Sequence, residues 1–160
     1  MNDRRLLLIP GTLCDAELWR HQIDHLGDVA EVHVGRHSLD DHPDAIAQRL
    51  LDEMPPGPFA MAGLSMGGYL ALAVMRIAPE RVTRLCLLDT SARADTPEQA
   101  KRRADLVDLA QKGDFQGSTR RMLPVFIHPD RLEEEPLRSD VMAMNKRVGL
   151  EAYLRQQKAN

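Results

Sequence analysis

The sequence contains little cysteine. Its 160 residues include two cysteines, Cys14 and Cys86, which are too few for a disulfide framework and do not have the spacing of metal ligands. We therefore expect a reduced, cytoplasmic protein in which both thiols are buried or half-buried, with a disulfide between them as the alternative. The sequence predicts no metal and no cofactor.

Excess positive charge and long apolar runs are also missing. The formal net charge is −3 and the pI is about 6.1, so the chain has no basic field for nucleic acid or an anionic membrane. The apolar run after Arg4 and Arg5 spans only residues 6–9, which is too short for a signal peptide or a membrane span. These absences favour a small-molecule or protein partner, and they leave the oligomeric state open.

What the sequence does contain is an alternation of apolar strands with amphipathic helices. With 43% hydrophobic residues the chain can bury a core, and a single α/β unit is the default. The expected strands are residues 6–9, 31–34, 59–62 and 82–88, and the expected helices between them are 16–26, 43–54 and 66–78. This order predicts an open parallel sheet of about four strands with helices on both faces. The first strand, and the fourth over residues 85–88, are apolar without alternation, which is typical of strands covered on both faces. No strand pattern follows the fourth strand, so we expect it to be an unpaired apolar edge unless the lid covers it.

The character of the chain changes after Asp89. Thr96 and Gln99 form the pattern of a capping box, which predicts the start of a helix. The expected helices run from 97 to a stop at Gly113, over 115–127, over 136–148 and from 150 onward. We therefore divide the chain into an α/β core, residues 1–92, and a helical lid segment, residues 93–160, which we expect to be incomplete. An ordinary helical subdomain is the alternative reading of this segment.

The motif Gly63-Leu64-Ser65-Met66-Gly67 joins the third strand to the next helix. An apolar run stops at Gly63 and a helix pattern begins directly after Ser65, which is the strand–turn–helix context that G-x-S-x-G requires. Such a turn presents the serine hydroxyl through a strained backbone, and strand and helix approach so closely that the two glycines have no room for a Cβ atom. A tight packing turn with an idle serine is the alternative.

Ser65 is the candidate nucleophile, and two backbone amides are the candidate oxyanion donors. If the strand order is second, first, third, fourth, the loop after the first strand, residues 11–13, faces Ser65 across a crevice. The N–H groups of Met66, at the helix N-terminus, and of Thr12, on the facing loop, fit the arrangement of an oxyanion hole. Leu13 is the alternative second donor, because the sequence does not fix the register of the loop.

Three segments resemble the α/β-hydrolase family. They are Leu-Leu-Leu-Ile-Pro-Gly-Thr at 6–12, Ala-Gly-Leu-Ser-Met-Gly-Gly-Tyr at 62–69, and Ala-Pro-Glu-Arg-Val-Thr-Arg-Leu-Cys-Leu-Leu-Asp-Thr at 78–90, together with Asp15 and Trp19. The likeness is strong from Leu6 to about Ala94 and loose in the lid. It is greatest to lid-bearing esterases, lactonases and C–C hydrolases, which include the enol-lactone hydrolases of aromatic catabolism. The family often has His before the glycine of the oxyanion loop, where this chain has Pro10.

The resemblance implies a triad in the order Ser, acid, His, with the acid and the His beyond the lid. The sequence stops at Asn160, within the lid, so we expect the amino-terminal part of an enzyme of roughly 250 residues. None of the histidines follows a strand at the carboxyl edge of the expected sheet, and His37 and His128 are the least unsuitable as a base. Asp89, at the end of the fourth strand, is a candidate acid, with a capping role in its loop as the alternative.

The sequence thus predicts a serine hydrolase that acts on a small carboxylic ester or lactone through an acyl-enzyme. Ser65 is the expected nucleophile, and Leu13, Met122 and Phe126 are the expected substrate-binding side chains, in a lid whose flexible apolar residues suit apolar ligands. An acyltransferase, a thioesterase or a C–C hydrolase on the same fold is the alternative. A non-catalytic ligand-binding protein that keeps the turn at residues 63–67, the nucleophile elbow, is the alternative from another class.

Overall fold

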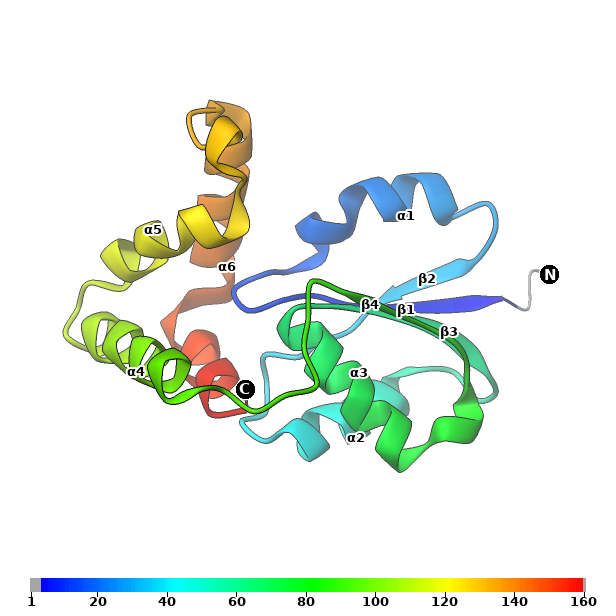
Figure 1. Ribbon diagram of the computed structural model, residues 1–160. Coiled ribbons are helices and arrows are strands. Elements are labelled where there is room, and N and C mark those ends of the chain that lie inside the picture. Colours follow the sequence, from blue (N-terminus) through cyan, green and yellow to red (C-terminus); the bar gives the residue numbers. More distant parts are fainter. Residues whose placement is uncertain (1–3, 160) are drawn as a thin grey trace.

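Four parallel strands form one sheet in the order β2-β1-β3-β4 (Figure 1). The computed structural model describes residues 4–159, apart from the side chains of Gly117 and Ser118. The strands are β1 (Arg5–Ile9), β2 (Glu31–Val34), β3 (Phe59–Leu64) and β4 (Val82–Leu88). The predicted fold class and strand order are confirmed. The order reverses between β1 and β3, where Ile9 pairs with Gly63, so the carboxyl ends of these two strands lie side by side.

Helices cover both faces of the sheet (Figure 1). The 3-10 turn η1 (Ala16–Trp19) and α1 (Arg20–Leu26) lie on one face, and α2 (Pro43–Glu53) and α3 (Met66–Ile77) lie on the other. Leu8 packs with Trp19 on the first face, and Leu7 packs with Leu50 on the second. Because successive side chains of a strand point to opposite faces, a continuous apolar run such as β1 fills both cores. The helix expected over 16–26 is present, but its first four residues form the 3-10 turn η1 and only the rest is the α-helix α1.

The chain beyond β4 is helical in its described part. Its elements are α4 (Pro97–Gln111), α5 (Phe115–Phe126), the 3-10 turn η3 (Pro129–Arg131) and α6 (Glu135–Ala159), and a further 3-10 turn, η2 (Pro79–Arg81), precedes β4. The predicted capping box of Thr96 and Gln99 begins α4. Gly149, with φ 78° and ψ 170°, interrupts α6. The sequence predicts one helix that ends before this glycine and another that begins after it. Helices α4–α6 lie beyond the carboxyl ends of the strands (Figure 1).

The carboxyl-terminal part of α6 is attached to the α/β unit. Arg147 donates to the carboxylate of Asp15 at 2.7 and 3.1 Å, and Arg155 donates to the carbonyl oxygen of Ser38 at 2.8 Å. Ala159 packs in the same apolar cluster as α2 and α3. These contacts hold the last helix against the loops that follow β1 and β2.

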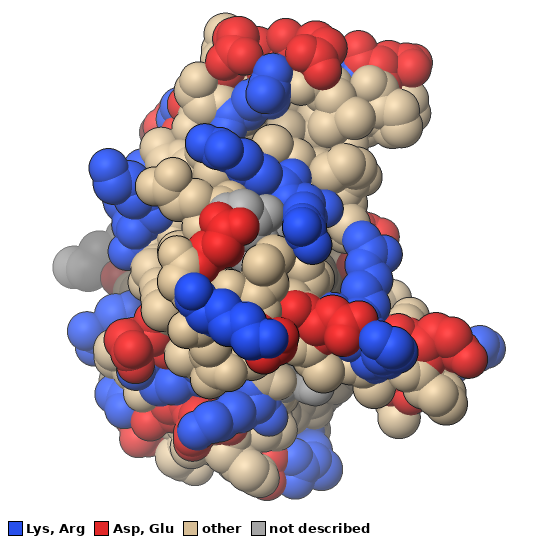
Figure 2. All heavy atoms as spheres, turned by 90° about the vertical axis from the view of Figure 1, so that its left-hand side faces the viewer, with Lys and Arg blue, Asp and Glu red and all other residues tan. Residues whose placement is uncertain are grey.

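The face formed by α4–α6 carries both signs of charge (Figure 2). Lys101 pairs with Asp105 at 2.7 Å, and Arg131 pairs with Glu134 at 2.8 Å. Such exposed pairs within one helix or turn contribute little to stability. Each pair joins a positive and a negative side chain, so it adds no net charge to this face. Within residues 4–159 no helix combines the length and the apolar content needed to span a bilayer.

Strand β4 is, in the described sheet, the unpaired edge that the sequence predicts where no further strand follows. Five consecutive residues of this strand, 83–87, are exposed, among them Leu85 and Leu87 at 38% and 42%. The strand is the edge of the described sheet, so no described strand pairs with its outer side. Cys86 is therefore exposed as well, whereas Cys14 is buried as expected, and both thiols are free.

We expect the two thiols of this chain to react with a thiol reagent at very different rates. Cys86 is exposed, whereas burial, and secondarily the charge of Asp15, raises the pKa of the Cys14 thiol to about 12. The thiolate is the reactive form, so dithionitrobenzoate at mildly alkaline pH should titrate Cys86 quickly and Cys14 only after denaturation. Cys86→Ser should abolish the fast phase. Equal rates for the two thiols in the native chain would contradict the burial of Cys14.

Candidate active site

Ser65 lies at a sharp turn between β3 and α3. Its φ of 53° and ψ of −118° lie in a region that a residue with a side chain rarely adopts. Two contacts from the end of β4 hold this turn: the Ser65 N–H donates to the Leu88 carbonyl oxygen at 2.9 Å, and the Thr90 hydroxyl donates to the Ser65 carbonyl oxygen at 2.7 Å. The backbone of Ser65 is thus fixed on both sides, and its side chain is half-buried.

The glycines around Ser65 allow a very close approach of backbone to backbone. A Cβ atom on Gly63 would lie 2.2 Å from the carbonyl oxygen of Gly67, and a Cβ atom on Gly67 would lie 2.1 Å from that of Ile9. Both distances are far below van der Waals contact. The steric prediction for this motif is therefore confirmed, and α3 begins directly against the ends of β1 and β3.

The loop of residues 11–13, which we call the oxyanion loop, lies beside Ser65. A Cβ atom on Gly11 would lie 3.5 Å from the Ser65 Cβ, and the Thr12 hydroxyl donates to Met66 Sδ at 3.6 Å. Among the hydrogen bonds of residues 4–159, none uses the N–H of Thr12 or of Met66. Leu13 differs, because its N–H donates to the side-chain oxygen of Gln156 at 3.0 Å. The alternative donor is therefore already engaged, and Thr12 and Met66 stay available.

A cavity of about 320 Å³ opens at Ser65, between the sheet and the helices beyond it. Its lining is mainly apolar and comes from the loop after β1, from η1, from the end of β3 and from α5 and α6. The apolar side chains in the lining are Leu18, Leu64, Val125, Phe126, Leu137, Val141 and Met144. Phe126 lines the cavity as the sequence predicts. The methionine that reaches it from the helical segment is Met144.

The other two expected substrate-binding residues, Leu13 and Met122, do not line this cavity. Leu13 is fully buried and packs with Ala110 and Tyr153, and Met122 packs against the same cluster. These side chains join α4, α5 and α6 to the oxyanion loop. In the described structure both side chains take part in packing.

Four charged residues border the cavity: Glu17, Arg20, Asp89 and Asp140. Arg20 pairs with Glu17 and lies 3.6 Å from the carboxylate of Asp140, so it joins η1 to α6 at the rim. Asp89 follows β4 with a φ of 44°, and it lines the same cavity as Ser65. Within residues 4–159 there is no group of three or more His, Cys, Asp or Glu that could hold a metal ion.

No described histidine lines the cavity at Ser65. His37 is buried, and its Nε2 lies 3.0 Å from the carbonyl oxygen of Gly11; desolvation lowers its pKa. His128 is exposed, and its Nδ1 accepts from the N–H of Asp130 at 3.3 Å. The two histidines considered as a base thus lie elsewhere, one behind the oxyanion loop and one at a turn.

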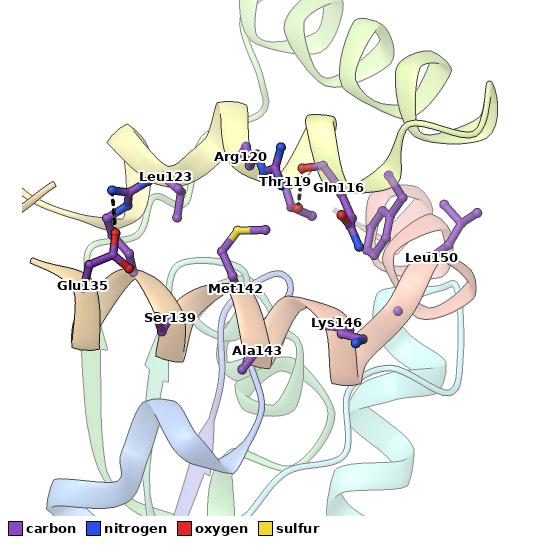
Figure 3. Close-up of a pocket in the computed structure, with 13 residues that line it drawn as sticks. Gln116, Thr119, Arg120, Leu123, Glu135, Ser139, Met142, Ala143, Lys146 and Leu150 are labelled. Carbon is purple, nitrogen blue, oxygen red and sulfur yellow. Dashed lines mark hydrogen bonds and ion pairs between the residues drawn. The ribbon is translucent and has the colours of Figure 1, made fainter. Parts of the chain in front are cut away.

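A second hollow, of about 520 Å³, lies between α5 and α6 (Figure 3). Met142 points from α6 toward α5, and Thr119 is buried with its hydroxyl donating to the carbonyl oxygen of Gln116 at 3.0 Å. Arg138 and Glu135 form an ion pair at 3.0 Å at one end of the hollow. The lining does not include Ser65 or the oxyanion loop, so this space is separate from the candidate active site.

Comparison with known proteins agrees with this geometry. A family model described as the alpha/beta hydrolase fold matches residues 4–125. A pimeloyl-[acyl-carrier protein] methyl ester esterase from Nitrosomonas europaea is 37% identical over an alignment of 81 positions, which covers 48% of this chain and 30% of that protein.

Solved structures extend the likeness to the helical segment. A thermophilic esterase from Thermogutta terrifontis matches with a TM-score of 0.75 at 24% identity, over 99% of this chain and 62% of that one. A hydrolase from Pseudomonas aeruginosa matches with a TM-score of 0.82 at 20% identity, over 99% of this chain and 64% of that one. At these identities the likeness shows the fold alone. The chain spans less than two thirds of the length of these two solved structures. Its match covers under a third of the pimeloyl-[acyl-carrier protein] methyl ester esterase.

Proposed function

Because the chain belongs to the α/β-hydrolase fold family, we propose that Ser65 is the nucleophile of a serine hydrolase that cleaves a small carboxylic ester or lactone. One observation carries the proposal. The strained turn places Ser65 at the mouth of an apolar cavity, beside two backbone N–H groups, of Thr12 and Met66, that donate to no other group among residues 4–159. A nucleophile, unengaged donors and a space for an acyl group are the parts that acyl transfer needs.

The proposed reaction begins with attack of the Ser65 oxygen on the carbonyl carbon of the ester. The hydroxyl proton passes to a base, and the carbonyl oxygen becomes an oxyanion that accepts from the N–H groups of Thr12 and Met66. Collapse of this intermediate breaks the ester C–O bond, and the protonated alcohol leaves. Water then attacks the acyl-enzyme and releases the acid, which restores Ser65. The described histidines lie away from the cavity, so we assign the base to none of them.

The substrate class follows from the size and the walls of the cavity. About 320 Å³ is at the lower end of the range for small-molecule sites, and apolar side chains such as Leu18 and Met144 suit a short acyl or alkyl group. The similarity to a pimeloyl-[acyl-carrier protein] methyl ester esterase supports an ester as the substrate. The free thiols of Cys14 and Cys86 support the cytoplasmic location expected from cysteine use.

We also propose that residues 93–160 act as a lid over the core of residues 1–92. Val125 and Phe126 of α5 and Val141 of α6 border the cavity from the side opposite the sheet, as lid residues would. Closure by these helices would exclude water during acylation.

The test is covalent labelling of the protein expressed from its complete natural reading frame. A fluorophosphonate probe should form one adduct, which peptide mass spectrometry should locate on Ser65, and p-nitrophenyl esters with short acyl chains should be hydrolysed faster than those with long chains. Transfer of the acyl group to an added alcohol or thiol in preference to water would favour an acyltransferase. Binding of esters without turnover or labelling would favour a non-catalytic ligand-binding protein.

A further inference from the structure

The side chain of Gln156 on α6 is completely buried and reaches the oxyanion loop. Its exposed fraction is 0%, and its side-chain oxygen accepts from the N–H of Leu13 at 3.0 Å. A backbone N–H can only donate, so this contact fixes which end of the amide faces the loop. Leu13 has a φ of 59°, which a leucine adopts only where its surroundings hold it.

The nitrogen end of the Gln156 amide contacts the loop that follows β2. Its Nε2 donates to Ser38 Oγ at 3.1 Å and lies 3.1 Å from His37 Nε2. The same ring nitrogen of His37 lies 3.0 Å from the carbonyl oxygen of Gly11. Gln156 and His37 therefore contact the oxyanion loop on both sides of Thr12.

These contacts bear on the direction of the Thr12 N–H. A peptide unit is planar, so the N–H of Thr12 turns together with the carbonyl group of Gly11, and the N–H of Leu13 turns together with the carbonyl group of Thr12. The Gly11 oxygen also accepts from the N–H of Cys14 at 3.1 Å, and the Thr12 oxygen accepts from the Cys14 thiol at 3.4 Å. Both peptide units are held at their other polar groups, while the Thr12 N–H has no acceptor among residues 4–159.

We propose that Gln156 is a positioning residue for the reaction at Ser65: by binding the Leu13 N–H from α6, it holds the oxyanion loop so that the Thr12 N–H points at the developing oxyanion. The inference rests on the proposed function, because it assigns the loop its task from that reaction. It also couples the last helix to catalysis, since a displacement of α6 releases the loop.

The decisive variants are Gln156→Met, Gln156→Glu and the control Gln157→Met. Methionine matches glutamine in length but offers the Leu13 N–H only a thioether sulfur, a weak acceptor, whereas the glutamate carboxyl group still offers an oxygen. Gln157 is the next residue along α6; it contacts Arg103 at 3.2 Å and not the oxyanion loop, so its variant controls for the loss of an amide from this helix. Circular dichroism checks that each variant is folded at the temperature of the assay.

The measurement is the rate of fluorophosphonate labelling at Ser65, with kcat and KM for a p-nitrophenyl ester and the exchange rate of the Leu13 amide proton. Losing one oxyanion donor outright costs roughly 100- to 1,000-fold, so a misaimed donor in Gln156→Met should slow labelling at least about 10-fold. We expect the loss in kcat and not in KM, faster exchange of the Leu13 amide, recovery to within about 3-fold in Gln156→Glu, and no loss in Gln157→Met.

A merely structural role predicts a different result. It would lower the melting temperature of Gln156→Met and leave the labelling rate of the folded fraction unchanged. A folded Gln156→Met protein that is labelled as fast as the wild type would overturn the positioning role while leaving Ser65 as the nucleophile. A wild-type protein that is not labelled at Ser65 would overturn the proposed function, and the positioning role with it.

Discussion

Ser65→Gly is expected to be more stable than Ser65→Ala, although neither variant can be labelled at this position. Glycine adopts the backbone conformation of residue 65, at φ 53° and ψ −118°, without a clash, whereas alanine keeps the same strain as serine. The gain should be about 1 kcal/mol, or about 3 °C in melting temperature for a chain of this size. Both variants should lose ester hydrolysis, because the hydroxyl proposed to attack the carbonyl carbon is gone.

The matched control is Ser91, which follows β4 and has no positive φ. There the order should reverse, with Ser91→Gly less stable than Ser91→Ala, because glycine loses more freedom on folding where its special conformation is not needed. Thermal melting of the four variants and labelling of the two Ser91 variants complete the test. If Ser65→Gly melts no higher than Ser65→Ala, the turn is not strained, and the backbone conformation that presents Ser65 has no cost in stability.

The elbow and the sheet could be predicted because their signals are local. The apolar runs that form β1 and β3 each fill a short stretch of sequence. The glycines on either side of Ser65 indicate that neighbouring segments approach too closely for a Cβ atom. Given the strand order of second, first, third, fourth, the loop of residues 11–13 and Ser65 had to meet where the order reverses. Sequence reasoning therefore placed the candidate nucleophile and its candidate donors in one site.

The exposed edge at β4 could be predicted from the number of expected strands, but not from the strand itself, because the burial of a strand depends on its neighbours. The run Leu85-Cys86-Leu87-Leu88 is as apolar as β1, yet β1 has a strand on each side and β4 has one. An apolar strand indicates that some surface will cover it, but the sequence of the strand does not say which segment does so.

The cavity lining in the helical segment was predicted only in part, for a related reason. Met122, Phe126 and Met144 are all flexible or large apolar residues on helices, but which of them faces Ser65 depends on how α5 and α6 pack. Gln156 left a weaker trace: it occupies the buried stripe of α6 formed by Ala152, Tyr153 and Ala159, where a polar side chain requires a partner. Its partner lies 143 positions earlier in the sequence, so no local pattern could identify it.

Gly67→Ala is expected to abolish folding under conditions in which the wild type is stable. The new methyl group would lie 2.1 Å from the Ile9 carbonyl oxygen and 2.7 Å from that of Pro10. Both are backbone atoms at the end of β1, so relief requires α3 or β1 to move, at the expense of the pairing of β1 with β3. A cost above about 4 kcal/mol is expected, which is a large share of the stability of an ordinary domain.

Gly27→Ala provides the comparison, because Gly27 has a φ of −58° and a Cβ atom there would meet one atom at 3.4 Å, an ordinary contact. That variant should unfold in urea within about 0.5 kcal/mol of the wild type or at slightly higher stability. Any Gly67→Ala protein that does fold must have moved the end of β1, and the oxyanion loop begins two residues after Ile9, so its labelling at Ser65 should be slow. A Gly67→Ala protein with the urea midpoint and the labelling rate of Gly27→Ala would show that α3 can retreat from β1 without cost, and the close approach at the elbow would then have no part in placing the nucleophile.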